Sequence, residues 1–193
     1  MTGAFALPAS AQCEAKNDAF QTGEHVMYDL DGKVEGIIKG EVCSVGVEST
    51  VLDLTDGEPV ILRPGGITKE MLEAEIGKVY VGGDGNRPKA PGMKYKHYAP
   101  KAPLYVTKGN IYDELKKYPD KKVGVMLTEK LRFDEQVSTF YLGDAPADYA
   151  HNLFKALRFF DDMGVDVIIA QDIKGGGICE AVRNRLYKAA NNR

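Results

Sequence analysis

The sequence has few cysteines and lacks the cysteine spacings that hold metal ions or disulfide frameworks. Cys13, Cys43 and Cys179 are an odd number, and no two of them stand in a Cys-x-x-Cys pair. A structural zinc site or a small disulfide-stapled fold needs cysteines in such patterns. We therefore expect neither, and a reducing cytoplasm is the predicted location.

An excess of basic charge and a long apolar run are also missing. Lys plus Arg number 25 against 28 for Asp plus Glu, which gives a net charge of −3. A nucleic acid would need a local basic cluster, because the whole chain supplies no attractive field. No apolar run approaches the roughly 20 residues that span a bilayer. The start TGAFALPASAQ lacks the basic region of a secretion signal. We expect no direct nucleic-acid binding and no membrane segment.

Common hydrolase motifs are absent from the sequence. It has no His-Glu-x-x-His, no Gly-x-Ser-x-Gly and no Cys-His pair in a recognisable context. His25 and His151 fall in predicted helices without metal-binding neighbours at useful spacing, so both are predicted to be structural. The chemistry must come from other residue types.

The first half of the chain becomes regular near Thr22. A helix is predicted for Thr22 to Tyr28, and Val- and Ile-rich stretches predict strands. A further helix should begin at Thr68 and end at Ile76 before Gly77, with Glu70 in its first turn. The predicted strands are Gly36 to Lys39, Val45 to Leu54 and Pro59 to Arg63.

The second half alternates predicted strands with predicted helices. Glycine and proline are dense from Tyr80 to Pro103, which excludes a long helix there and indicates a linker. An amphipathic helix is predicted from Ala145 to Met163, capped by Asp144 and ended by Gly164. This alternation predicts a parallel α/β domain. Its strands are expected at Pro103 to Val106, Lys122 to Leu127, Ser138 to Leu142 and Val165 to Ala170, and its last helix at about Ile178 to Ala190.

Three motifs follow one another in a specific order. They are VGVESTVLDL from Val45 to Leu54, ILRPGGIT from Ile61 to Thr68, and APGMKYKHYAP from Ala90 to Pro100. Together they resemble the YrdC/Sua-type threonylcarbamoyl-AMP synthases, and the resemblance runs from about Thr22 to Arg193. It implies a partial YrdC-like α+β catalytic domain at 1–79, a linker covering the active site at 80–102, and a Rossmann-like parallel α/β domain at 103–193.

The resemblance also implies a reaction. In this family L-threonine, bicarbonate and ATP, with Mg²⁺, give threonylcarbamoyl-AMP and pyrophosphate for the threonylcarbamoyladenosine modification of tRNA. The protein would mainly align the reactants and neutralise charge on the phosphates. No covalent enzyme intermediate is required.

The family roles carry over residue by residue. By resemblance Ser49 binds threonine and Arg63, before the Pro-Gly-Gly turn, binds ATP, because a guanidinium suits bidentate contact with phosphate. The linker would fold over the nucleotide as a lid. Its implied ATP contacts are Lys94, Tyr95, His97 and Tyr98. Glu48 and Asp53, five apart on one extended strand, point to opposite faces and are not expected to act as a pair.

The front of the catalytic domain departs from the family pattern. Where the family has Pro-Ser-Ala-Asn-x-Ser-Gly, this chain has Pro8-Ala9-Ser10-Ala11-Gln12-Cys13. Ser10 is the candidate to replace the family's serine in binding threonine. We expect a truncated or frame-shifted form, with a missing N-terminal half as a possible complement.

Other interpretations of the sequence remain open. The chain could be a non-catalytic nucleotide-binding or protein-docking fragment of the synthase. Gly175-Gly176-Gly177 could receive a phosphate at the start of the last helix, or could be a flexible entry to it. A flavodoxin-like or receiver domain at 103–193 would need a phosphate loop at Val106 to Asn110.

Overall fold

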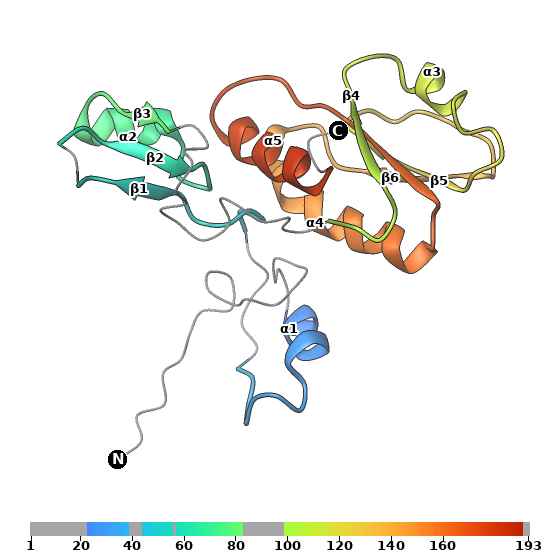
Figure 1. Ribbon diagram of the computed structural model, residues 1–193, viewed down its shortest axis with the longest axis horizontal. Coiled ribbons are helices and arrows are strands. Elements are labelled where there is room, and N and C mark those ends of the chain that lie inside the picture. Colours follow the sequence, from blue (N-terminus) through green and yellow to red (C-terminus); the bar gives the residue numbers. More distant parts are fainter. Residues whose placement is uncertain (1–22, 39–43, 56, 83–98, 191–193) are drawn as a thin grey trace.

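The computed structural model describes residues 23–38, 44–55, 57–82 and 99–190. Its described part holds a small sheet with one helix, a larger parallel sheet with three helices, and the short helix α1 (Gly23–Leu30) (Figure 1). Helix α1 ends at Leu30, two residues beyond the predicted end at Tyr28. The mixed α/β class predicted from the sequence is confirmed.

The small sheet is built from the first two motifs. Strand β2 (Val60–Arg63) lies between β1 (Val51–Asp53), which is antiparallel to it, and β3 (Tyr80–Val81), which is parallel to it. The antiparallel register places Val51 opposite Arg63. This pairing brings the second half of the first motif to the start of the second.

Helix α2 (Lys69–Ile76) joins β2 to β3 and has the ends that its sequence predicts. The Thr68 hydroxyl accepts a hydrogen bond from the Met71 N–H at 3.4 Å, and Gly77 at the other end has φ +78°. A threonine cap and a left-handed glycine satisfy backbone groups that the helix leaves unpaired. The predicted helix at this position is confirmed.

The larger sheet is wholly parallel and has the order β4-β7-β5-β6. Strand β7 lies between β4 and β5, so the four strands have the order 1-4-2-3 when numbered along the chain. A dinucleotide-binding sheet has the order 3-2-1-4-5-6. The predicted strands and helices of this half are confirmed within one or two residues. In chain order the elements are β4 (Leu104–Thr107), α3 (Ile111–Leu115), β5 (Val123–Leu127), β6 (Val137–Tyr141), α4 (Pro146–Met163), β7 (Val167–Gln171) and α5 (Ile178–Ala189).

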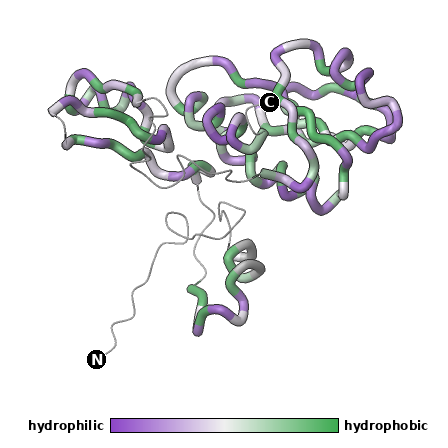
Figure 2. The backbone as a smooth tube through the Cα atoms, viewed as in Figure 1, coloured by the Kyte–Doolittle hydropathy of each residue, from purple (hydrophilic) through white to green (hydrophobic). Residues whose placement is uncertain are grey.

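The two faces of this sheet have separate apolar cores. On one face α4 and α5 cover residues such as Met126 and Ile168, and on the other α3 and the following loops cover Val125 and Ile169. The apolar colour of the central strands in Figure 2 matches their burial. Strands buried on both faces read as continuous apolar runs, which is why VGVML and VIIAQ were recognisable in the sequence.

Three local predictions were wrong. Residues 36–38 form no strand, and in the stretch from Val45 to Leu54 only Val51–Asp53 is paired as a strand. Asp144 does not cap α4, whose cap position is Ala145. The Asp148 carboxylate reaches back to the Ala145 N–H at 3.0 Å, and Asp144 instead accepts a hydrogen bond from the Tyr141 hydroxyl.

Candidate substrate-binding site

The first two motifs meet through Ser49 and Arg63. The Arg63 Nη2 atom donates to the Ser49 carbonyl oxygen at 3.0 Å and lies 3.4 Å from the Ser49 Oγ atom. Ser49 is exposed just before β1, and Arg63 is half-buried at the end of β2. The pairing of β1 with β2 therefore places a hydroxyl and a guanidinium side by side at one point of the surface.

Gly65 and Gly66 let the two motifs pack against each other. A Cβ atom on Gly65 would lie 2.3 Å from the Glu48 carbonyl oxygen, so only glycine fits there. The Gly66 N–H donates to the same carbonyl oxygen at 3.1 Å, and the Thr50 hydroxyl donates to the Ile67 carbonyl oxygen. The close approach at this turn is therefore to the backbone of Glu48 to Thr50.

Glu48 is a member of the site that the sequence reasoning did not identify. Its carboxylate forms a buried ion pair with Arg185 of α5, with 2.7 Å between Glu48 Oε2 and Arg185 Nε. The same guanidinium donates through Nη1 to the Pro64 carbonyl oxygen at 2.6 Å. The two residues are 137 positions apart, and no local periodicity in the sequence connects them.

Asp53 takes a different role from Glu48. Its Oδ1 atom accepts hydrogen bonds from the Thr55 N–H at 3.0 Å and the Thr55 hydroxyl at 2.6 Å, which shapes the turn after β1. The two carboxylates thus point to different partners. The expectation that both carboxylates lie on one extended strand is wrong, because Glu48 precedes β1 and lies outside it.

Helix α4 and the start of α5 also contact the first half of the chain. Gly46 has φ +77°, and a Cβ atom there would lie 2.3 Å from the Cα of His151 on α4. At α5 the Gly177 N–H donates to Glu70 Oε1 at 3.2 Å. Helix α4 therefore packs directly on the loop that carries Ser49, and the start of α5 contacts helix α2.

The carboxylate of Glu70 lies where one interpretation placed a phosphate. Its pKa is lowered by a hydrogen bond from its own backbone N–H, then by Thr68 and, less strongly, by Gly177. A negative charge is favoured at the N-terminus of a helix. In this structure the chain supplies that charge itself, from helix α2.

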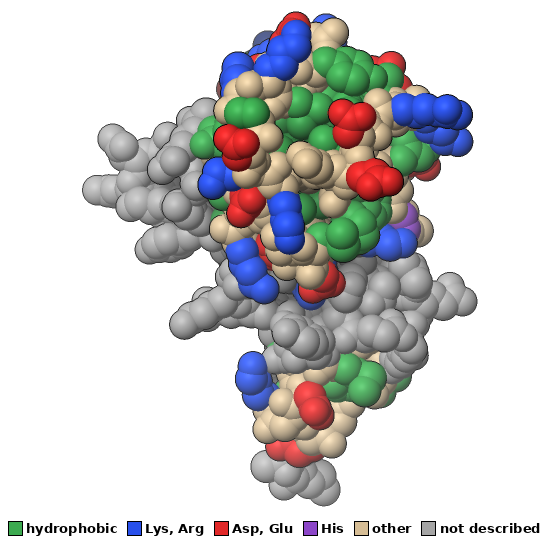
Figure 3. Space-filling view, turned by 90° about the vertical axis from the view of Figure 1, so that its right-hand side faces the viewer, with side chains coloured by type: hydrophobic (Ala, Val, Ile, Leu, Met, Phe, Trp, Pro, Cys, Tyr) green, Lys and Arg blue, Asp and Glu red, His purple; other side chains and the backbone are tan. Residues whose placement is uncertain are grey.

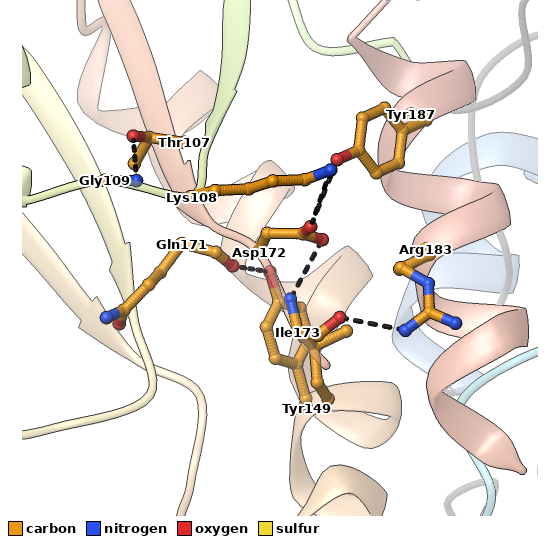
Figure 4. A network of polar contacts seen from close by, with 9 residues as sticks. All are labelled: Thr107, Lys108, Gly109, Tyr149, Gln171, Asp172, Ile173, Arg183 and Tyr187. Atoms are coloured by element: carbon orange, nitrogen blue, oxygen red, sulfur yellow. Dashed lines mark hydrogen bonds and ion pairs between the residues drawn. The ribbon is translucent and has the colours of Figure 1, made fainter. Parts of the chain in front are cut away.

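At the carboxyl ends of β4 and β7, polar side chains of the network contact one another (Figure 4). Tyr187 donates to Asp172 Oδ2 at 3.1 Å, and the Lys108 Nζ atom lies 4.0 Å from the same oxygen. The Gly109 N–H donates to the Thr107 hydroxyl at 3.1 Å. The loop that a receiver-like domain would use for phosphate therefore directs these groups to the chain itself.

Tyr149 is buried beneath this network. Its hydroxyl donates to the Gln171 carbonyl oxygen at 2.8 Å. Burial raises the pKa of the phenol, and the nearby Asp172 charge adds to the shift. The group therefore serves as a neutral hydrogen-bond donor that joins α4 to the end of β7.

Five of the predicted site residues lie outside the described residues. They are Ser10, Lys94, Tyr95, His97 and Tyr98. The structure brings together Ser49 and Arg63. No group of three or more His, Cys, Asp or Glu side chains that could hold a metal ion occurs in the part of the chain that the structure describes, and no helix there is long and apolar enough to cross a membrane.

The family model described as threonylcarbamoyl-AMP synthase, C-terminal domain, matches residues 67–191. The chain belongs to the threonylcarbamoyl-AMP synthase family. A second model, described as telomere recombination, matches residues 4–65. We expected similarity to begin at about Thr22, and this match corrects that expectation, because it reaches the stretch that contains Ser10.

Curated relatives in this family come from archaea, bacteria and yeast. The threonylcarbamoyl-AMP synthase of Pyrococcus abyssi is 44% identical over 186 residues, which are 89% of this chain and 54% of that protein. The Bacillus subtilis synthase is 42% identical over 192 residues, 88% of this chain and 53% of that protein. The Schizosaccharomyces pombe synthase is 33% identical over 195 residues, which are 87% of this chain and 48% of that protein. The chain spans about half the length of the curated relatives it matches.

Two solved structures of a synthase resemble this chain. Sua5 of P. abyssi in complex with L-threonine has a TM-score of 0.81 and 41% identity, covering 95% of this chain and 57% of that one. A variant of P. abyssi Sua5 in which a consecutive histidine and tyrosine are replaced by alanine has a TM-score of 0.80 and 42% identity, covering 91% and 54%.

Proposed function

We propose that this chain binds L-threonine and ATP and takes part in making threonylcarbamoyl-AMP for tRNA modification. The observation that carries the proposal is the contact between Ser49 and Arg63, which brings the implied threonine-binding hydroxyl within 3.4 Å of the implied ATP-binding guanidinium. The names of the family and its relatives, and the threonine complex of P. abyssi Sua5, support it.

The contact suits the proposed reaction because the two substrates must meet. The neutral threonine amine adds to carbon dioxide with loss of a proton, or to bicarbonate with loss of water, and becomes a carbamate. A carbamate oxygen then forms a bond to the α-phosphorus of ATP while the bond to the departing pyrophosphate breaks. A fixed cation beside the threonine site would hold the reactants in line and offset the negative charge that collects there.

We assign separate roles to the residues on either side of this meeting point. Ser49, with Ser10, would hold the threonine, and Arg63 would contact the phosphates. Mg²⁺ would enter as the partner of the ATP phosphates, a common arrangement for this ion. Bicarbonate is the proposed source of the carbamoyl carbon.

The linker at 80–102 is proposed to close over the nucleotide, between a catalytic part at 1–79 and an α/β domain at 103–193. His97-Tyr98 is the one His-Tyr pair in the sequence, and a consecutive histidine and tyrosine were replaced in the P. abyssi variant. Lys94 and Tyr95 would add a cation and a stacking ring to the same lid.

Direct binding of tRNA is not part of this proposal. On the face shown in Figure 3, Lys and Arg side chains are interspersed with Asp and Glu. With a net charge of −3, this distribution gives no extended basic surface on that face. This chain would release threonylcarbamoyl-AMP and would not itself bind the tRNA.

Pyrophosphate release by the purified chain tests the proposal. With ATP, Mg²⁺, L-threonine and bicarbonate present, we expect release that depends on threonine. Arg63→Ala should abolish it and should also remove the thermal stabilisation by ATP. Arg132→Ala, which removes an exposed guanidinium from a loop of the other domain, is the matched control and should behave as the wild type.

The outcomes separate the two interpretations of the sequence. Stabilisation by ATP without pyrophosphate release would favour a non-catalytic nucleotide-binding fragment. A folded chain that responds to neither ATP nor threonine would refute the proposed function.

A further inference from the structure

Arg185 on α5 contacts both segments that carry the candidate site residues Ser49 and Arg63. Its side chain is 2% exposed, and that of its partner Glu48 is 7% exposed. Through Nε it binds the Glu48 carboxylate, and through Nη1 it binds the Pro64 carbonyl oxygen. One rigid guanidinium thus joins the two segments of the first half to the last helix of the chain.

Each of these two contacts lies one residue from a proposed substrate-binding residue. Glu48 precedes Ser49, and Pro64 follows Arg63. The planar guanidinium directs its donors in fixed directions, so it sets the distance between the two acceptors. A shift of either segment would change the separation of the Ser49 hydroxyl from the Arg63 guanidinium.

The buried pair is a poor device for stability alone. Removing two charges from water costs more free energy than their attraction returns in many proteins, and apolar residues of similar size often serve as well. The positions around Arg185 on the inner side of α5, such as Val182 and Leu186, are apolar and fully buried. An arginine at this place therefore calls for a role beyond packing.

We propose that Arg185 is a positioning residue for the substrate site, which couples the α/β domain to the geometry of Ser49 and Arg63. This inference rests on the proposed function for the identity of the ligand, but not for the geometry. The α/β domain then acts on the reaction through α5, without contacting substrate. Arg185 itself touches neither threonine nor ATP.

Threonine titration of the full chain followed by NMR tests this role. We expect Arg185→Met to raise the Kd for L-threonine at least about tenfold, the effect of losing hydrogen bonds made by a charged group. Arg185→Lys keeps the charge but lacks the fork that reaches two acceptors, so its Kd should lie between those of wild type and Arg185→Met. Glu48→Gln should weaken binding in the same direction.

A core variant separates positioning from mere loss of stability. Leu157→Ala on α4 removes a buried side chain from the apolar core and leaves Arg185 and its partners in place. At a temperature where every variant is folded, Leu157→Ala should bind threonine within about twofold of wild type. Equal Kd values for the wild type and Arg185→Met, or equal losses in Arg185→Met and Leu157→Ala, would overturn the inference.

A second measurement needs no ligand. The Gly66 N–H donates to the Glu48 carbonyl oxygen at 3.1 Å, so its hydrogen exchange reports on the contact between the two segments. It should exchange at least about tenfold faster in Arg185→Met than in Leu157→Ala. If the wild-type chain did not bind threonine, the proposed function would fail, while this exchange rate would still decide the role of Arg185. If Arg185→Met does not fold, Arg185→Lys and Glu48→Gln are compared with Leu157→Ala in its place, by the same threonine Kd and the same Gly66 exchange rate.

Discussion

Gly46 lies directly against the backbone of His151, so that a Cβ atom at position 46 would come within 2.3 Å of the His151 Cα. This contact fixes the loop of the first motif on helix α4. It also explains why the loop from Val45 to Thr50 is not a strand, although its composition favours one. Its backbone is held by the neighbouring helix rather than by a partner strand.

Gly46→Ala is therefore expected to destabilise the protein strongly. The variant combines a left-handed backbone with a collision against α4, and we expect a loss of about 3 kcal/mol in the free energy of unfolding. Gly57→Ala is the matched control, because Gly57 also has positive φ, +84°, but has nothing within 4 Å of the added atom. It should lose about 1 kcal/mol. Urea unfolding followed by circular dichroism measures both, and equal losses would show that the loop does not pack on α4.

Gly124 in β5 and Phe160 on α4 should be energetically coupled. A Cβ atom on Gly124 would lie 2.5 Å from the Phe160 Cδ1 atom, so Gly124→Ala should cost about 2 kcal/mol through overpacking. Phe160→Leu creates space at the same point. The double variant should lose less stability than the sum of the two single variants by about 1 kcal/mol. Additive losses in the double-mutant cycle would contradict the close packing of α4 on this strand.

Asp148, rather than Asp144, should stabilise the start of α4. Because Asp148 accepts the Ala145 N–H at 3.0 Å, Asp148→Ala should lower the free energy of unfolding by about 1 kcal/mol. Asp144→Ala removes the hydrogen bond between Tyr141 and Asp144, but this contact is exposed and screened by solvent, so the variant should cost less than Asp148→Ala, about 0.5 kcal/mol. Thermal unfolding of the two variants compares them directly, and the reverse order of losses would favour the cap that the sequence predicted.

The error over this cap shows what local sequence can and cannot predict. A Ser, Thr, Asp or Asn before a helix predicts a cap, and Asp144 fits that pattern. Asp148 instead acts from the third position inside the helix, as in a capping box. The choice depends on the Tyr141 hydroxyl, which binds Asp144. In contrast, Gly77 and Gly164 end their helices as predicted. Glycine has no Cβ atom and therefore adopts positive φ without steric cost, whatever its neighbours are.

The candidate site was predictable only where it depends on motifs and on contacts between segments close in sequence. Ser49 and Arg63 belong to motifs, and β1 and β2 are close in sequence, so their pairing follows from a short connection. Arg185 carries no motif and meets Glu48 only because α5 packs on the first half of the chain. The place of β7 between β4 and β5 likewise follows from tertiary packing, which alternation of strands and helices does not encode.

The phenol of Tyr141 should lose its proton at a higher pH than the other exposed tyrosines of the chain. Its hydrogen bond to Asp144, together with the charge of that carboxylate, raises its pKa to about 12. In the unfolded chain the ordinary value is about 10. A raised folded-state pKa means that the neutral phenol stabilises the fold below about pH 10, and that this contribution is lost as the pH rises through about 12.

NMR of tyrosine-labelled protein, titrated from pH 9 upward, measures this pKa directly. Asp144→Asn removes the charge and should return the Tyr141 pKa toward 10, while Asp162→Asn, at the far end of α4, should leave it unchanged. The difference in Tm between wild type and Tyr141→Phe should be constant below about pH 10 and should narrow above it. A Tyr141 that titrates with the exposed tyrosines in the wild type would show that the contact with Asp144 does not persist in solution, and the preference of Asp144 for Tyr141 over the α4 cap would lose its physical basis.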